Sequence, residues 1–341
     1  MREDGKQSRA LVGPHTHSDD FIRSTIDYVL YDQLPQIRRC SLESQCIDSP
    51  TMSWQAKIDG MDKLPLLNHP LEEQTAFTPQ SLMDTVRRAR RIPNGDAPPI
   101  CILEFDGDIT DWLVGQGLAQ PFPAWPCFHT TMFAIEVEGV QCGIIPRTIG
   151  GPYAVLIAEQ LAACGVELII GVTSAGRVSR QLPLPCLVSI TRAIRDEGAS
   201  LHYLQASKEI ACPAPDIAAL LEDELAEIGW AVRRGKVWTT DAPYRETETQ
   251  LQMWEKEGVL AVEMQAASLF AFGAARGVAV ASVAMVSNAV DHDGEQFNTG
   301  TQHDGLSIIK ACARVFKRAL QTRLSNFETQ PEPSRKSDLS R

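Results

Sequence analysis

The strongest constraint on the fold is a series of apolar runs that have the length of buried strands. They cover residues 100–105, 168–172, 259–262 and 278–286, and stretches with helical character separate them along the chain. Strands that are apolar along their whole length are buried on both faces, because an exposed face would add polar residues at every second position. The chain is therefore predicted to be an α/β protein whose mixed or parallel sheet is covered by helices on both faces.

Turn signals and periodicity predict the remaining elements. Thr78 and Pro79 are suited to begin a helix that continues through the basic residues 87–91. A hairpin is predicted at 128–137 and 141–145, and further strands at 186–194 and 231–239. Helices are predicted at 153–164, 217–228 and 304–321, together with an Ala-rich helix that follows the strand at 259–262 and ends at 275.

Composition divides the 341 residues into three parts. Residues 1–75 are polar and aperiodic apart from a weakly helical patch at 21–34, and we expect an extension that is disordered in part. Residues 76–325 are predicted to form a single α/β domain, and residues 326–341 a disordered tail.

Charge and cysteine usage exclude several classes of protein. The net charge of −11 disfavours a broad nucleic-acid surface, and no apolar run has the length of a membrane span. The nine cysteines form no CxxC pair and are expected to be reduced thiols, so we expect a cytoplasmic protein. The acidic and histidine residues at 291–293 are interpreted as a solvated loop, and no metal or other cofactor is expected.

Polar clusters follow the apolar strands in phase with them. In an α/β fold the ends of such strands gather at one edge of the sheet, so these clusters are predicted to line one cleft. They lie at 106–108, 147–148, 173–177, 196–203, 241–247, 263–265 and 287–288.

Each cluster also has a purely structural interpretation. Thr173 and Ser174 can form a simple turn, or can present hydroxyls and backbone N–H groups to an anion. Asp241 and Arg245 can pair with each other across a loop, or can contact a ligand. Asn288 at a strand end favours a functional role, because a buried amide needs partners.

The segment at 263–265 allows the same two interpretations. Glu263 can accept hydrogen bonds from two sugar hydroxyls, whereas a structural glutamate at the start of a helix would have the same sequence. Glu263 and Gln265 point in the same direction if the backbone there stays extended.

Taken together and in order, the motifs resemble those of the nucleoside phosphorylase/nucleosidase superfamily. The resemblance covers residues 98–320 and implies a mixed, partly closed central β-sheet flanked by helices. The motifs are GD at 107–108, IGGP at 149–152, VTSAG at 172–176, GASLHY at 198–203, TTDAPYRET at 239–247, VEMQA at 262–266 and VSNAVD at 286–291.

The part of the site that would bind phosphate, the acceptor of the sugar, is called the acceptor end. For this end the resemblance implies that Gly107 is the glycine of a phosphate-binding turn. Thr173 and Ser174 would hold the anion or a nucleophilic water. Outside the family pattern, Arg147 or Arg177 would supply positive charge from a different direction. Inorganic phosphate is accordingly expected as a co-substrate.

For the sugar, the resemblance implies that Met264 packs under the ribose after Glu263. Gln265 stands where the family usually places a glutamate that binds the 2′ and 3′ hydroxyls. Asn288 stands where purine-cleaving members carry an aspartate that assists the leaving base.

For the base, the resemblance implies contacts from the loop that contains Tyr244 and Arg245, with Asp241 beside them. The expected ligand is a small-molecule nucleoside, and the expected assembly is a homo-oligomer, either a dimer or a hexamer built from dimers.

Besides Gln265, two positions depart from the family pattern. Phosphorylases of the uridine type carry an arginine where this chain has Asp111, and another arginine where it has Gly171. A carboxylate that faces a phosphate dianion would repel it.

Three functions are therefore compared. The leading prediction is a phosphorylase, a pentosyltransferase in which Glu263 or the bound anion stabilises the oxocarbenium-like sugar and Asn288 donates a hydrogen bond to the departing base. A phosphate-independent nucleosidase is the first alternative. A nucleoside-binding or regulatory module with weakened catalysis is the second.

Overall fold

The structure is a computed structural model that describes residues 64–289 and 302–328, all within one compact unit. The helical patch expected at 21–34 lies outside the described residues, as do residues 1–63, 290–301 and 329–341. The three-part division of the chain therefore stays a prediction.

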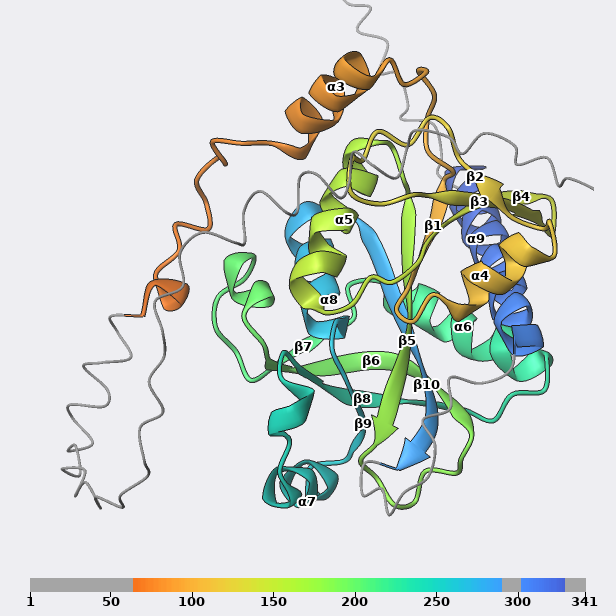
Figure 1. The fold of residues 1–341 in the computed structure, drawn as a ribbon. Helices are drawn as coiled ribbons and strands as arrows, with labels where there is room; N and C mark the ends of the chain where they lie inside the picture. Colours follow the sequence, from red (N-terminus) through yellow and green to blue (C-terminus); the bar gives the residue numbers. More distant parts are fainter. Residues whose placement is uncertain (1–63, 290–301, 329–341) are drawn as a thin grey trace, which may run out of the picture. The chain divides into compact units, whose positions relative to one another are not determined.

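Ten strands of the described residues form one mixed sheet, and part of it closes on itself (Figure 1). They are β1 (Ile100–Glu104), β2 (Gln120–Pro121), β3 (Phe133–Val137), β4 (Val140–Ile145), β5 (Leu168–Arg177), β6 (Cys186–Asp196), β7 (Glu209–Ala211), β8 (Val232–Thr240), β9 (Val259–Glu263) and β10 (Ala279–Ala289).

The closed part is a five-stranded barrel. Its strands follow one another in the order β5, β10, β6, β8 and β9, and β9 pairs with β5 again. The strands β1, β4, β3 and β2 continue the sheet outward from β5, and β7 pairs with β6. This arrangement confirms the predicted mixed, partly closed sheet.

Seven α-helices of the described residues flank this sheet. They are α3 (Pro79–Arg90), α4 (Asp108–Gly115), α5 (Gly151–Ala163), α6 (Pro215–Glu227), α7 (Glu248–Lys256), α8 (Ala266–Arg276) and α9 (Gln302–Glu328). Short 3-10 helices lie at η1 (Pro65–Leu67), η2 (Ala199–His202) and η3 (Pro243–Arg245). None of the helices within 64–289 and 302–328 is long and apolar enough to cross a bilayer.

The helices cover both faces of the sheet, as the apolar strands predicted. In Figure 1, α5 and α8 pack together on one side of β5 and β10, and α6 and α9 lie on the other. Strands β1, β5 and β10 are buried in the resulting core, with Ile102, Ile169 and Val283 at most 1% exposed.

Local signals explain where several helices begin and end. Thr78 accepts a hydrogen bond from the backbone N–H of Ser81, which confirms it as the cap of α3. Helix α8 ends at Gly277, whose φ of 68° is the left-handed conformation that glycine adopts most easily.

The structure corrects several boundaries. The turn expected after β1 is present at Gly107, and it leads directly into helix α4, which was not predicted. The capping box of Thr247 and Gln250 begins α7, which was also not predicted. The polar residues from Thr173 to Arg177 were expected beyond their strand but lie within β5, because β9 and β10 pair with this part of the chain. Likewise, Asn288 lies within β10.

Helix α8 gives a direct test of this core. Phe270 is fully buried, so Phe270→Ala should lower the free energy of unfolding by about 3–5 kcal/mol in urea denaturation. Leu156→Ala on α5 is the matched control, since Leu156 is 45% exposed and its truncation should cost less than about 1 kcal/mol. Equal losses for the two variants would contradict the assigned packing.

Candidate functional site

Strand pairing brings three predicted site residues into one neighbourhood. Ser174 lies in the C-terminal half of β5. Two residues further on, Gly176 pairs with Asn288 on one side and with Val262, which precedes Glu263, on the other. Ser174, Glu263 and Asn288 are therefore carried by adjacent strands at the same level of the barrel.

The strands that converge there do not all run in the same direction. β5 and β10 are parallel, whereas β9 runs antiparallel to β5 and β6 antiparallel to β10. The expectation of a single edge formed by the carboxyl ends of strands is therefore wrong in detail. The cluster forms where the end of β9 passes the C-terminal half of β5.

Gly107 forms the turn between β1 and α4. Its φ of 96° lies in the left-handed region, and an added Cβ would lie 2.8 Å from Cγ of Arg147. Both the conformation and the available space therefore require glycine. Arg147 itself has a φ of 58°, which is uncommon for a residue with a side chain. The structure thus brings together two of the residues predicted to bind phosphate.

A buried carboxylate occupies part of the first turn of α4. Glu104 is 2% exposed and accepts hydrogen bonds from the backbone N–H groups of Ile109 at 2.8 Å and Thr110 at 3.0 Å, and also from the Thr110 hydroxyl. Burial raises the pKa of Glu104, and these hydrogen bonds oppose the shift. Two amides at the start of α4 are thus already satisfied by the protein.

The carboxylate at position 111 has a partner. Asp111 forms an ion pair with Arg147, and the two side chains are 59% and 54% exposed. An exposed ion pair contributes little to stability, but it offsets the charge of Asp111 beside the Gly107 turn. The same pair also reduces the positive charge that Arg147 offers to an anion.

Ser174 faces a second carboxylate. Its hydroxyl donates a hydrogen bond to Oδ1 of Asp106 at 3.0 Å, and both residues are half-buried. Burial raises the pKa of Asp106, the bond from Ser174 lowers it, and the charge of Asp108 raises it. Thr173 is buried, and its hydroxyl donates to the backbone carbonyl of Ser174. The two predicted hydroxyl residues therefore have different surroundings.

Glu263 faces the protein interior. Its Oε1 accepts a hydrogen bond from the Thr239 hydroxyl at 2.5 Å, and its Oε2 accepts from the N–H groups of Gln265 at 2.7 Å and Ala266 at 2.8 Å. The carboxylate thus holds the start of α8, which is the structural role that the sequence left open. Burial raises its pKa to about 7 against these hydrogen bonds, and the charge of Glu197 adds to the rise.

Gln265 is completely buried, and within the described part of the chain both atoms of its amide lack hydrogen-bond partners. It lies beside Gly171, where an added Cβ would be 3.3 Å from Nε2 of Gln265 and 2.8 Å from Oγ of Ser282. Gly171 and Gln265, which both differ from the family pattern, are therefore neighbours. Met264 is half-buried, so of this segment its side chain has the better access to a ligand.

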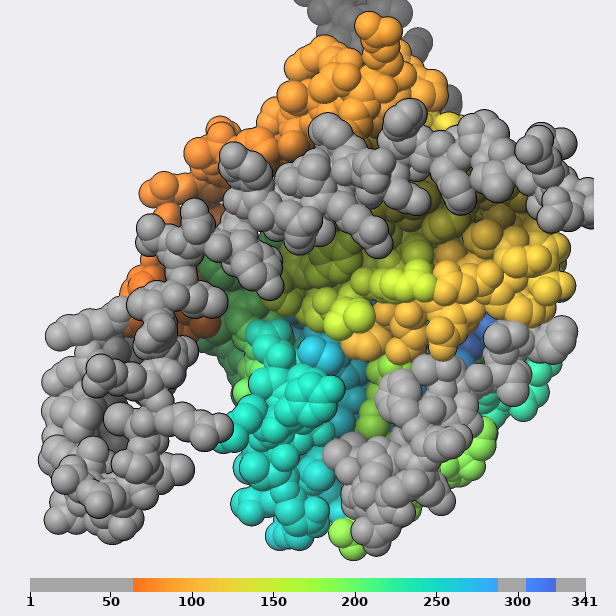
Figure 2. Space-filling view, viewed as in Figure 1, coloured from red at the N-terminus to blue at the C-terminus, as the bar shows by residue number. Residues whose placement is uncertain are grey.

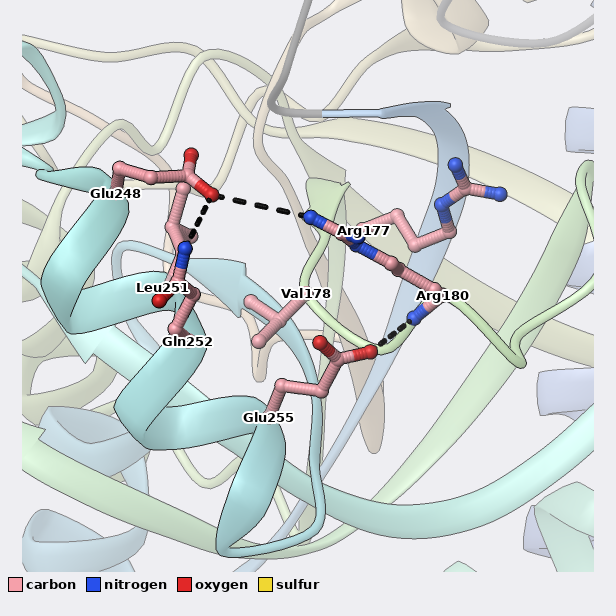
Figure 3. A pocket seen from close by; sticks show the side chains of 7 residues that line it. All are labelled: Arg177, Val178, Arg180, Glu248, Leu251, Gln252 and Glu255. Carbon is pink, nitrogen blue, oxygen red and sulfur yellow. Dashed lines mark hydrogen bonds and ion pairs between the residues drawn. The ribbon is translucent and has the colours of Figure 1, made fainter.

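Arg177 lies apart from Ser174. The two residues are three positions apart in β5, so their side chains leave opposite faces of an alternating strand. Figure 3 shows Arg177 in a pocket beside α7, where its guanidinium points away from Glu248 and Glu255. In the same pocket Arg180 approaches Glu248 at 3.8 Å and donates its backbone N–H to Glu255 at 2.7 Å.

Most side chains of the loop after β8 are exposed to solvent. Asp241 accepts a hydrogen bond from the backbone N–H of Gly198 at 2.9 Å, and burial raises its pKa. Tyr244 is 100% exposed and Arg245 is also exposed, so the protein encloses neither side chain. Figure 2 shows green and blue residues between this cyan segment and the yellow residues around α4.

Asn288 is placed by its backbone alone, through its pairing with Gly176. The acidic and histidine residues at 291–293 lie outside the described residues, so the absence of a metal there stays a prediction. The roles of Asn288, Met264 and the loop residues likewise stay predictions.

Sequence reasoning missed three contacts at this site. Glu104 gave a usable signal, because a carboxylate at the end of an apolar strand must find partners. The sequence predicts Asp106 only as part of a turn, because its partner Ser174 lies 68 positions further along the chain. Nothing in the sequence signals the pair of Arg147 and Asp111, which are 36 positions apart.

Residues 99–321 match the model of the phosphorylase superfamily, and the chain therefore belongs to this superfamily. It is 28% identical to guanosine phosphorylase of Halorubrum lacusprofundi over 152 residues, which is 44% of this chain and 61% of that protein. It is 24% identical to uridine phosphorylase of Escherichia coli over 170 residues, covering 46% of this chain and 67% of that protein.

A third relative is the DeoD-type purine nucleoside phosphorylase of Clostridium beijerinckii. It is 30% identical over 161 residues, which is 45% of this chain and 62% of that protein. The match to the guanosine phosphorylase spans about three-fifths of that relative's length. The relatives are named for purine nucleosides and for uridine, so they support the family and leave the substrate to be proposed.

The environment of Glu263 predicts a dependence of stability on pH. Folding raises its pKa from 4.5 to about 7, so ionisation opposes the folded state. The contribution of Glu263 is most favourable below pH 4.5 and should fall by about 3 kcal/mol as the pH rises to 7. Urea unfolding from pH 4.5 to 7.5 should show this fall relative to Glu263→Gln, whose amide stays neutral.

The exposed Glu248→Gln variant is the control and should follow the wild type at each pH. Parallel stability curves for the wild type and Glu263→Gln would show that Glu263 ionises normally in the folded protein.

Proposed function

We propose that this protein cleaves the N-glycosidic bond of a nucleoside and transfers the sugar to inorganic phosphate. It would then be a pentosyltransferase of the nucleoside phosphorylase type. The observation that carries the proposal is the Gly107 turn with Arg147 over it, next to Ser174 of β5. The names of the relatives support the same reaction.

The transition state of this reaction carries positive charge on the sugar and negative charge on the departing base. Because the carboxylate of Glu263 is engaged in the interior, we assign stabilisation of the sugar to the bound phosphate. Glu263 then acts by holding the turn that presents Met264 under the ribose. Asn288 donates a hydrogen bond to the base, which disperses its developing charge.

The other predicted contacts complete the proposed substrate complex. Asp241, Tyr244 and Arg245 approach the base after the loop closes. Gln265 reaches the sugar hydroxyls only if its side chain turns out of the interior, and its unpartnered amide is available for such a change.

A phosphate-independent nucleosidase is the second candidate. It is favoured by the carboxylates of Asp106 and Asp111 at the acceptor end, and by Gly171, where Ser282 leaves no room for a larger residue. These features lower the positive charge that a phosphate dianion requires.

Two further points belong to the proposal. The free thiols of Cys101, Cys142 and Cys312 are buried, which suits a reducing compartment such as the cytoplasm. Exposed apolar side chains at Ile149 and Phe128 are of the kind found at subunit contacts, and support a homo-oligomer.

Base release from a panel of purine and pyrimidine nucleosides, with and without phosphate, tests the reaction. We expect release that depends on phosphate. Asn288→Ala should lower kcat by about 100-fold or more, because one hydrogen-bond donor to the developing charge is lost. The exposed Asn94→Ala variant should keep full activity.

Equal release in the absence of phosphate would establish the nucleosidase instead. Nucleoside binding without turnover would contradict both enzymatic candidates. Full activity of Asn288→Ala would remove this residue from the site.

A further inference from the structure

The hydrogen bond between Ser174 and Asp106 fixes the direction of a proton. Ser174 donates its only hydroxyl hydrogen to Oδ1 of Asp106, so the lone pairs of Ser174 face the other directions. Within 64–289 and 302–328, Oδ2 of Asp106 has no hydrogen-bond partner. The groups that Ser174 and Asp106 offer to a ligand are therefore acceptors.

The charges around Asp106 reinforce this character. Glu104 and Asp108 flank it on β1 and α4, and both are close enough to interact with it electrostatically. The nearby cation is Arg147, which is paired with Asp111. Strand β5 contributes the hydroxyl of Ser174 on the facing side. An anion that enters here meets more negative than positive charge.

Only an oxyanion that carries an O–H group can donate a hydrogen bond to Asp106 or Ser174. Phosphate keeps at least one O–H group near neutral pH and can donate it to a carboxylate. Sulfate is fully deprotonated there, so it offers no donor and is repelled. A hydrogen-bond acceptor of the protein that finds no donor on the wrong ligand disfavours the binding of that ligand.

We propose that Asp106 determines the specificity of the acceptor site by accepting a hydrogen bond from the protonated oxygen of phosphate. Oxyanions without an O–H group are thereby excluded. This inference rests on the proposed use of phosphate. It also gives the acidic residues around the proposed phosphate position a function, since an oxyanion must carry a proton to bind there.

The test compares phosphate and sulfate as ligands of the full chain. Asp106→Asn keeps the size of the side chain and can still accept from Ser174, but its amide adds a donor. By isothermal titration calorimetry at pH 7.5, the wild type should bind phosphate at least about tenfold more tightly than sulfate. Asp106→Asn should bind sulfate about tenfold more tightly than the wild type does.

Two variants separate this role from general effects of charge. Asp216→Asn removes an exposed carboxylate from the first turn of α6 and should leave both affinities unchanged. Ser174→Ala should weaken phosphate binding yet keep the preference over sulfate, because Asp106 remains. Loss of the preference in Ser174→Ala would assign selectivity to the hydroxyl and overturn the proposal.

Acidification gives an independent readout. Protonation turns Asp106 into a donor, so sulfate binding to the wild type should improve as the pH falls, and sulfate binding to Asp106→Asn should change less. Equal affinities of the wild type for the two anions, or an unchanged preference in Asp106→Asn, would overturn the role of Asp106. A wild type that neither binds phosphate nor uses it for base release would overturn the proposed function itself.

Discussion

The double pairing of β5 is the constraint on which the site depends. Its C-terminal half lies between β10 and β9, and this pairing closes the barrel. Ser174 is thereby held beside the chain segment that contains Glu263 and beside the backbone of Asn288. If β5 ended at residue 172, as its apolar run predicts, the acceptor and sugar ends of the site would be on separate loops.

Buried carboxylates, rather than side-chain caps, fix the two helices at this site. Glu104 accepts hydrogen bonds from the first turn of α4, and Glu263 accepts them at the start of α8. Each carboxylate has a raised pKa because burial outweighs these bonds. The helix starts are thus set by the protein itself, and the Gly107 turn and Ser174 of β5 remain for the proposed ligand.

The fold was predictable from the sequence because its signals are local and repeated. Apolar strands gave the sheet, and Thr78 gave the start of α3. The candidate site residues follow from the order of their motifs, and their roles stay predictions. Their contacts were not predictable, because Asp106 with Ser174 and Asp111 with Arg147 are brought together only by the barrel. The inward direction of Glu263 is also a property of the packed helix start and not of the sequence.

The central proposal is that the residues around the C-terminal half of β5, where β9 and β10 pair with it, bind a sugar joined to a base. A crystal structure of the protein with a nucleoside and phosphate tests it most directly. The account predicts the sugar over Met264, the phosphate at Gly107 and Ser174, and the base next to Asn288. A nucleoside bound elsewhere, for example in the Arg177 pocket beside α7, would contradict it.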